Sequence, residues 1–309
     1  MTTRSLTVAA AQLGPVPKSA SRPDTLARLI KLLEAAATEG AQLVVFPEAA
    51  LTPFFPHWLV DDDNELLSYY EQSLPSPDTR ELFDAARELR VAFVLGYAER
   101  TDDDRYFNTA ALVDETGDVI HRYRKIHLPG FQSVQDGAPF QNLEKRYFEV
   151  GDLGFGVQSW RNTTIGLAIC NDRRWAETYR VLALKGAELV CLGYNTPAST
   201  PHLTESNDLT DFQNHLSMQA GAYQNSMWVV GTAKAGIEEG VAQIGGSVII
   251  APSGEIIATA RTLGDELVTA EIDLDMVMRY RRDVFNFEQH RRPEHYKSIT
   301  EPHPRGNTR

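Results

Sequence analysis

The fold of this chain is decided by residues 163–192, which read TTIGLAICNDRRWAETYRVLALKGAELVCL. The apolar stretch Thr163–Ile169 predicts a buried strand. Trp175–Leu184 predicts a helix closed by Gly186, and Glu188–Leu192 predicts the following strand. A strand, a helix and a second strand in this order form a βαβ unit with parallel strands. The stretch therefore predicts an α/β fold.

The same alternation extends outward from this unit. An earlier βαβ unit is predicted from a strand at Leu6–Gln12, a helix at Asp24–Ala37 and a strand at Leu43–Phe46. Ser76-Pro77 predicts the start of a helix that runs to about Leu89, because a capping serine precedes a first-turn proline. Further predictions are strands Val91–Tyr97, Trp228–Thr232 and Leu267–Ile272, a helix at Phe212–Tyr223, and hairpins formed by Thr109–Val113 with Val119–Arg122 and by Ser247–Ile250 with Ile256–Ala260.

The composition is that of one globular unit. The 309 residues can bury a large core, and 42% are hydrophobic while 23% are charged. We find no internal repeat and no linker, so we predict a single domain over residues 1–309. Residues 285–309 are polar and contain prolines, and we expect them to form a C-terminal arm that packs on a neighbouring subunit.

Charge and hydropathy exclude two classes of partner. The formal net charge is -12, which argues against nucleic acid because phosphate binding needs a basic surface. No apolar run approaches the ~20 residues of a membrane span, and the apolar stretch near the N-terminus is too short for a signal peptide. We expect a cytoplasmic protein without a membrane partner.

The two cysteines, Cys170 and Cys191, lie far apart and fit no metal-ligand spacing. The sequence leaves a disulfide between them open, although a cytosolic chain would keep both reduced. Each cysteine is therefore a packing residue or a chemical group, and we expect neither a metal nor a cofactor.

Three polar residues directly follow apolar strands, at the edge where loops of a parallel sheet converge. They are Glu48, Lys125 and Cys170. A thiol with an ordinary pKa of ~8.5 needs a base or a nearby cation to become a nucleophile. A glutamate can accept its proton, and an ammonium group can stabilise the oxyanion formed when sulfur attacks an amide-like carbon. The three side chains suffice for amide hydrolysis.

Each of these residues also has a structural explanation. A cysteine at a strand end is more often packed in a core than reactive. A glutamate after a strand is usually a solvated or capping group, and a lysine in Arg122–Lys125 is usually one charge on an exposed strand end. Periodicity alone does not decide between these explanations and catalysis.

A resemblance to a known family favours catalysis. The segments Phe-Pro-Glu (46–48), Tyr-Arg-Lys-Ile-His-Leu-Pro-Gly (123–130) and Ile-Cys-Asn-Asp-Arg-Arg-Trp (169–175) resemble the nitrilase superfamily in order and spacing. Further segments resemble one branch, the N-carbamoyl-D-amino acid amidohydrolases; they are residues 143–149, 151–155, 184–188, 193–197, 216–221 and 285–291.

The resemblance implies a four-layer α-β-β-α sandwich that forms homodimers or homotetramers. It implies Cys170 as nucleophile, Glu48 as general base and Lys125 as oxyanion stabiliser, with Glu144 as a second active-site glutamate. The implied reaction is hydrolysis of N-carbamoyl-D-amino acids to the D-amino acid, carbon dioxide and ammonia through a cysteine thioester.

The implied substrate is a small carboxylated molecule. Arg173 and Arg174 follow the nucleophile, and a planar guanidinium suits two-point contact with a carboxylate. The resemblance also assigns Asn171, Asn195 and Thr196 to the carboxylate pocket. Without it, these three would be explained as polar turn or helix-capping residues, and the arginine pair as a solvated helix start.

Two departures from the branch bear on the substrate range. Residues 131–142 are poorer in histidine and charge, and Asn142 and Gln213 replace histidines near the expected pocket mouth. The alternatives are a related amidase or ureido-acid hydrolase with another carboxylated substrate, a true nitrilase, and a scaffold protein with a decayed site. Retention of all four expected catalytic residues argues against decay.

Overall fold

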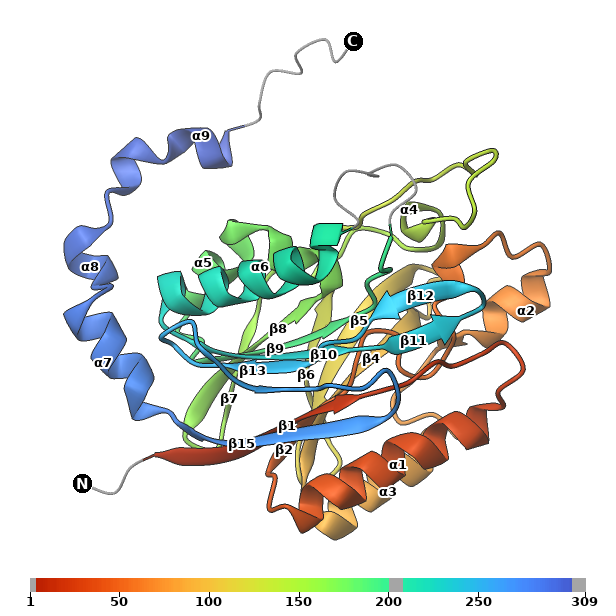
Figure 1. The fold of residues 1–309 in the computed structure, drawn as a ribbon, viewed down its shortest axis with the longest axis horizontal. Helices are drawn as coiled ribbons and strands as arrows, with labels where there is room; N and C mark the ends of the chain where they lie inside the picture. Colours follow the sequence, from red (N-terminus) through yellow and green to blue (C-terminus); the bar gives the residue numbers. More distant parts are fainter. Residues whose placement is uncertain (1–3, 200–207, 302–309) are drawn as a thin grey trace.

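The computed structural model describes residues 4–199 and 208–301, which form two β-sheets (Figure 1). The first sheet has the order β15-β1-β2-β4-β5-β6, with β3 paired to β4. Strands β1, β2 and β4 are parallel, as the earlier βαβ unit predicted. Its strands are β1 (Ser5–Gln12), β2 (Leu43–Val45), β3 (Tyr70–Glu71), β4 (Ala92–Arg100), β5 (Tyr106–Val113), β6 (Val119–Arg124) and β15 (Glu266–Asp273).

The second sheet has the order β14-β13-β10-β9-β8-β7, and its central strands β8, β9 and β10 are parallel. Its strands are β7 (Val157–Trp160), β8 (Thr163–Ile169), β9 (Leu189–Tyr194), β10 (Trp228–Ala233), β13 (Val248–Ile250) and β14 (Ile256–Thr259). A separate two-stranded ribbon joins β11 (Ala235–Glu238) and β12 (Val241–Ile244).

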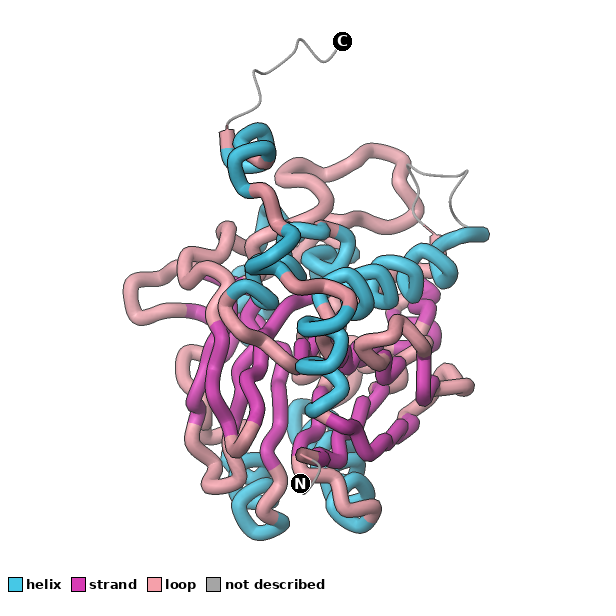
Figure 2. Tube along the Cα trace, turned by 90° about the vertical axis from the view of Figure 1, so that its left-hand side faces the viewer, coloured by secondary structure: helices cyan, strands magenta, loops and turns pink. Residues whose placement is uncertain are grey.

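The sheets pack face to face, and helices cover both outer faces (Figures 1 and 2). Helices α1 (Arg22–Thr38) and α3 (Arg80–Leu89) share an apolar cluster with the first sheet. Helices α5 (Ala176–Leu184) and α6 (Thr210–Asn225) share another with the second sheet. This confirms the predicted four-layer α-β-β-α sandwich. Shorter helices are α2 (Asp63–Ser68) and α4 (Glu144–Tyr147), with 3-10 turns at η1 (Phe55–His57) and η2 (Cys170–Arg174).

One predicted helix boundary is wrong. Helix α3 begins at Arg80 and not at Ser76-Pro77. The hydroxyl oxygen of Thr79 accepts a hydrogen bond from the Ser76 N–H, and the Thr79 N–H donates to the Ser76 carbonyl. Ser76 therefore closes a turn before the helix instead of capping it. The sequence patterns also missed β3, β7, the β11–β12 ribbon, α2 and α4, which are all short, and the longer helix at Asp275–Asp283.

The C-terminal segment after β15 first packs on the edge of the sandwich, where Val277 is buried in the core, and its last helices lie on the outside (Figure 1). It contains α7 (Asp275–Asp283), α8 (Phe287–His290), η4 (Pro293–His295) and α9 (Lys297–Thr300). Neither α8 nor α9 has a buried residue. Within the chain the arm touches α5, where the Arg180 guanidinium lies 4.3 Å from the Phe287 ring centroid. Packing of this arm on another subunit stays a prediction, and residues 302–309 of the predicted arm lie outside the described residues.

Among the described residues, no helix is both long enough and apolar enough to cross a membrane.

The segment that carries Glu48 passes through a narrow gap between the two sheets. A Cβ at Gly96 of β4 would lie 2.5 Å from the Pro47 carbonyl oxygen, and one at Gly193 of β9 would lie 2.5 Å from the Glu48 nitrogen. Each glycine thus leaves the space in which the Glu48 backbone lies. Both sheets fix this residue, one from each side.

We expect Gly193→Ala to displace Glu48 and to destabilise the fold. The added methyl group has only backbone atoms beside it, so overpacking should lower the free energy of unfolding by about 1–3 kcal/mol, as measured by chemical denaturation. Gly264→Ala is the control because a Cβ at Gly264 meets no atom within 4 Å. Equal stabilities of the two variants would show that the gap is not tight.

Candidate active site

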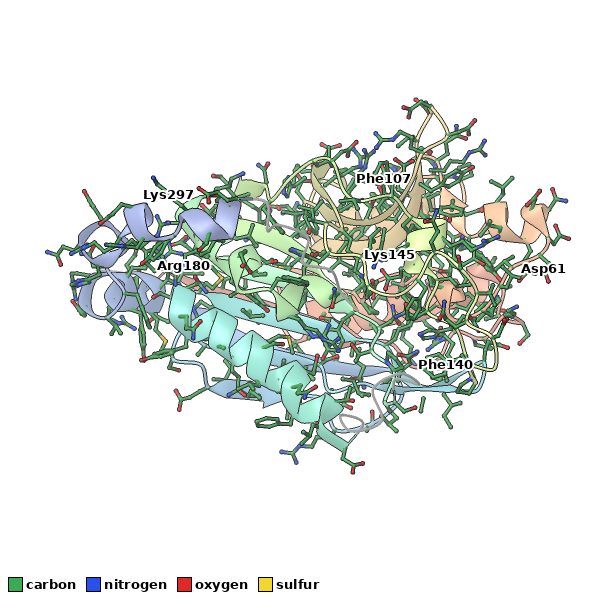
Figure 3. All side chains as sticks on the ribbon, turned by 90° about the horizontal axis from the view of Figure 1, so that it is seen from above. Asp61, Phe107, Phe140, Lys145, Arg180 and Lys297 are labelled. Carbon is green, nitrogen blue, oxygen red and sulfur yellow. The ribbon has the colours of Figure 1, made fainter. Side chains whose placement is uncertain are left out.

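The structure brings the ends of three predicted strands together at one edge of the sandwich. Glu48 follows β2, Lys125 follows β6 and Cys170 follows β8. Cys170 and Glu144 line a cavity of about 340 Å³ at this edge. Figure 3 locates the region by Phe140 on the cavity wall and by Lys145 beside Glu144 in α4, both distant from the arm residue Lys297. The sequence-based grouping of these side chains is thus reproduced in space.

Lys125 lies at the centre of the site, with no exposed side-chain surface. Its Nζ donates to Glu48 Oε1 at 2.8 Å and to Glu144 Oε2 at 2.6 Å. Both carboxylates are almost fully buried. One ammonium group therefore fixes two carboxylates, and its backbone is held by a bond from the Lys125 N–H to the Asn108 carbonyl.

Glu48 has a second set of partners that the sequence did not reveal. Asn108 Nδ2 donates to Oε1 at 2.7 Å, and the Asn195 backbone N–H donates to Oε2 at 2.9 Å. Asn195 Nδ2 also donates to the Glu48 carbonyl at 2.7 Å. Together with Lys125, these two residues hold the carboxylate in one orientation.

Cys170 forms a sharp turn between β8 and η2, with a φ of 47°. Non-glycine residues seldom adopt this left-handed conformation, and its strain is typical of functional sites. The Cys170 thiol donates to the Asn195 carbonyl at 3.3 Å. Since the N–H of the same residue binds Glu48, Asn195 joins the sulfur and the carboxylate through its own backbone.

Asp172 supports the turn and was missed as a functional residue, although it lies in the quoted 169–175 segment. It is fully buried. Its Oδ2 accepts from Tyr123 Oη at 2.7 Å and from the Ile169 N–H at 3.0 Å. Its Oδ1 accepts from the His127 N–H at 3.1 Å and lies 2.8 Å from His127 Nδ1. The carboxylate therefore links the turn to the loop that follows Lys125.

The charges favour a protonated thiol in the resting site. Burial raises the pKa of Cys170 and the Glu48 carboxylate adds to the increase, while Lys125 and Arg173 oppose it. Burial by itself would lower the pKa of Lys125, but the Glu144 and Glu48 carboxylates, together with Cys170 when it is a thiolate, outweigh this effect and raise that pKa. Lys125 therefore stays charged, and Cys170 needs a base to lose its proton.

The Glu144 carboxylate has a pKa near neutral pH. Burial raises the pKa of Glu144 to about 7, with Lys125 opposing and Glu48 adding to the increase. Glu144 therefore exchanges a proton near neutral pH.

Cys191, the other cysteine, has no comparable role. Cys191 is fully buried in β9, where burial raises its pKa, and neither cysteine forms a disulfide.

The two predicted carboxylate-binding arginines differ in the structure. Arg173 is buried, and its Nη1 donates to the Cys170 carbonyl at 2.7 Å while Nη2 donates to Thr196 Oγ1 at 2.8 Å. Arg174 is exposed, lines the cavity and has no ion-pair or hydrogen-bond partner in the part of the chain that the structure describes. Arg174 is thus free to bind a ligand, whereas Arg173 stabilises the turn at Cys170.

The other predicted binding residues also line the cavity. Asn171 Nδ2 donates to the His127 carbonyl at 3.0 Å, and Asn195 Oδ1 is buried without a partner among residues 4–199 and 208–301. None of Asn171, Asn195 and Thr196 caps a helix. Their position supports the assignment to the pocket over the helix-capping explanation.

The divergent segment 131–142 reaches the cavity as expected, through Phe131, Phe140 and Asn142. Gln213 does not. It is exposed on α6 and is absent from the described cavity wall, so the expectation for this position is corrected. The sequence missed two further wall residues, Phe54 and His57, because no motif marks them.

The described residues contain no cluster of three or more His, Cys, Asp or Glu side chains able to hold a metal ion.

Comparison with known proteins identifies the family. The family model for carbon-nitrogen hydrolases matches residues 7–282. A nitrilase of Pyrococcus abyssi is 34% identical over 86% of this chain and 90% of its own length. An N-carbamoylputrescine amidase of Solanum lycopersicum is 30% identical over 96% and 95%. The chain therefore belongs to the carbon-nitrogen hydrolase family, within the nitrilase superfamily.

The fold agrees with this assignment. The crystal structure of a carbon-nitrogen hydrolase from Helicobacter pylori G27 superposes with a TM-score of 0.82, covering 97% of this chain and 99% of that one at 24% identity. The catalytic class, hydrolysis of amide-type carbon–nitrogen bonds, follows from the family.

The raised pKa of Glu144 predicts a pH-dependent change in stability. The folded protein binds more protons than the unfolded chain between the ordinary pKa of 4.5 and about 7, so this group lowers stability as pH rises through that window. Glu144→Gln lacks the titration. We expect its free energy of unfolding, relative to the wild type, to rise by about 2–3 kcal/mol from pH 4.5 to 7.5 in denaturant titrations.

The control is Glu81→Gln, which removes an exposed carboxylate on α3. A Glu144→Gln difference that stays constant with pH would contradict the raised pKa.

Proposed function

We propose that the protein hydrolyses N-carbamoyl-D-amino acids to D-amino acid, carbon dioxide and ammonia. The observation that carries the proposal is one cavity whose wall contains both Cys170, in contact with the Glu48–Lys125 pair through Asn195, and the unpaired cation Arg174. Cys170, Glu48 and Lys125 supply the chemistry of amide hydrolysis. Arg174 supplies a partner for a substrate carboxylate.

In the first step Glu48 accepts the Cys170 thiol proton while the sulfur attacks the ureido carbonyl carbon. The Lys125 ammonium and the Asn171 backbone N–H stabilise the oxyanion that forms. Collapse of this intermediate breaks the bond to the terminal nitrogen, and the proton held by Glu48 leaves with it as ammonia. A thioester between Cys170 and the carbonyl carbon remains.

In the second step Glu48 takes a proton from water, and the hydroxyl oxygen attacks the thioester carbon. The carbon–sulfur bond breaks and the proton returns to Cys170. The released carbamate decomposes to the free amino acid and carbon dioxide. Glu144, with its pKa of about 7, lies against Lys125 and positions the substrate beside it.

The charges at the cavity favour an anionic substrate over a cationic one. The cavity wall contains one carboxylate, Glu144, which is already paired with Lys125, and two arginines. Its other ionisable residues, His57 and Cys170, are uncharged near pH 7, because burial lowers the pKa of His57 to about 3 and raises that of Cys170. An unpaired arginine attracts a carboxylate and repels an amine. This contrasts with the cationic substrate implied by the name of the N-carbamoylputrescine amidase relative. The D configuration of the substrate is proposed from the resemblance to the N-carbamoyl-D-amino acid branch.

The alternatives share parts of this site. A related amidase or ureido-acid hydrolase would use the same catalytic groups on another carboxylated substrate. A catalytically decayed scaffold would leave Cys170 inert to iodoacetamide at neutral pH and unprotected by N-carbamoyl amino acids.

We also propose that the chain forms a homodimer or homotetramer. Large apolar side chains are exposed along the outer helical layer, which supports association through it; they include Leu184, Phe212, Leu216 and Tyr223.

Ammonia release over paired D- and L-N-carbamoyl amino acids tests the proposed substrate, in the wild type and in Arg174→Ala. We expect turnover of the D series. We expect Arg174→Ala to raise KM by about 10- to 100-fold with little change in kcat, because a charge-assisted hydrogen bond contributes ~1.5–3 kcal/mol.

Two controls accompany this experiment. For an N-alkylurea without a carboxylate, Arg174→Ala should leave KM unchanged. Arg87→Ala, on the exposed face of α3, should have the KM and kcat of the wild type. Turnover confined to L substrates would reject the D assignment. An unchanged KM for carboxylated substrates would reject the role of Arg174.

A further inference from the structure

A second buried ion pair lies outside the proposed mechanism. Lys234 and Glu238 are each at most 1% exposed, and their Nζ and Oε2 atoms are 3.0 Å apart. Lys234 lies between β10 and β11, and Glu238 ends β11. Stability alone does not account for such a pair, since apolar residues of similar volume usually stabilise a core at least as well.

The pair binds the backbone of the segment that follows Glu48. Lys234 Nζ donates to the Thr52 carbonyl at 2.5 Å. Glu238 Oε1 accepts from the Phe54 N–H at 2.5 Å, and Oε2 accepts from the Val16 N–H at 2.8 Å. The ion pair therefore reaches residues about 180 positions away in the sequence and fixes the middle of residues 48–57.

The two ends of this segment have different functions. Glu48 at its start is already held by Asn108, Lys125 and Asn195. Phe54 and His57 at its end line the cavity. Lys234 and Glu238 thus act between the catalytic carboxylate and the cavity wall.

We propose that Lys234 and Glu238 are positioning residues that set the place of the Phe54–His57 wall and thereby determine which substrate side chains fit beside Cys170. The inference rests on the assignment of this cavity as the substrate site.

The wall that they position is an uncharged aromatic surface. The His57 ring lies edge-to-face with Phe54, at 4.8 Å between centroids, and with Phe140 at 5.3 Å. Burial, together with the nearby Lys234 charge, lowers the pKa of His57 to about 3. His57 is therefore neutral near pH 7, and a neutral aromatic wall suits an apolar group on the ligand.

Alkylation of Cys170 tests the proposal without a known substrate. The sulfur displaces iodide from iodoacetamide or from the bulkier N-phenyliodoacetamide, whose ring needs additional space in the cavity beside Cys170. For Lys234→Met we expect the ratio of the N-phenyliodoacetamide rate to the iodoacetamide rate to fall about tenfold or more, because small displacements of a binding wall have large effects. The iodoacetamide rate itself should stay within about twofold of the wild type.

With a turned-over N-carbamoyl amino acid, the same variant should show a raised KM with kcat largely retained. Glu238→Asp, which keeps the charge and shortens the side chain, is a second variant and should give a smaller change in the same direction. The matched control is Glu188→Gln, which removes a partly buried ion pair with Arg4 at the opposite end of β9.

A normal rate ratio in both pair variants would overturn the proposal, as would an equal fall in Glu188→Gln, which would indicate general destabilisation. If both reagents alkylate the wild type but it turns over no N-carbamoyl amino acid, the proposed function is rejected. The positioning role is then tested by the alkylation rates alone.

Discussion

The buried Lys125 ammonium group is the interaction on which the site depends. A charge without solvent must be paired, and Lys125 is paired twice, with Glu48 and with Glu144. Removing it would leave two buried carboxylates facing each other. Burial, together with the Glu48 carboxylate, raises the pKa of Cys170 and keeps the thiol protonated, and Glu48 is the proposed acceptor of its proton. The contact between Lys125 and Glu48 therefore both neutralises a buried charge and places the two groups for the proposed chemistry.

The two-sheet architecture is what brings these groups together. Glu48 and Lys125 follow strands of the first sheet, and Cys170 and Asn195 follow strands of the second. Neither sheet alone contains the complete site. The glycine-lined gap at Gly193 lets the backbone of Glu48 approach the second sheet closely enough to bind Asn195. Face-to-face packing thus serves both the core and the active site.

Much of this could be predicted from the sequence, because strands and their ends have local signatures. The strand at Thr163–Ile169 and the position of Cys170 after it follow from hydrophobic pattern alone, and the roles came from resemblance. The rest depends on contacts between distant segments. No local pattern could show that Asn108 binds Glu48, that Glu238 binds Phe54, or that Arg173 is engaged while Arg174 is free. Gln213 was misplaced because a helix position does not specify which face meets the cavity.

The central claim is that Cys170 forms the covalent intermediate, and the most direct measurement is ammonia release by Cys170→Ala with Cys191→Ala as the matched control. Both residues are buried cysteines, but only Cys170 lines the cavity. The account predicts that Cys170→Ala folds and has no turnover, while Cys191→Ala retains activity. Substantial ammonia release by folded Cys170→Ala would contradict it.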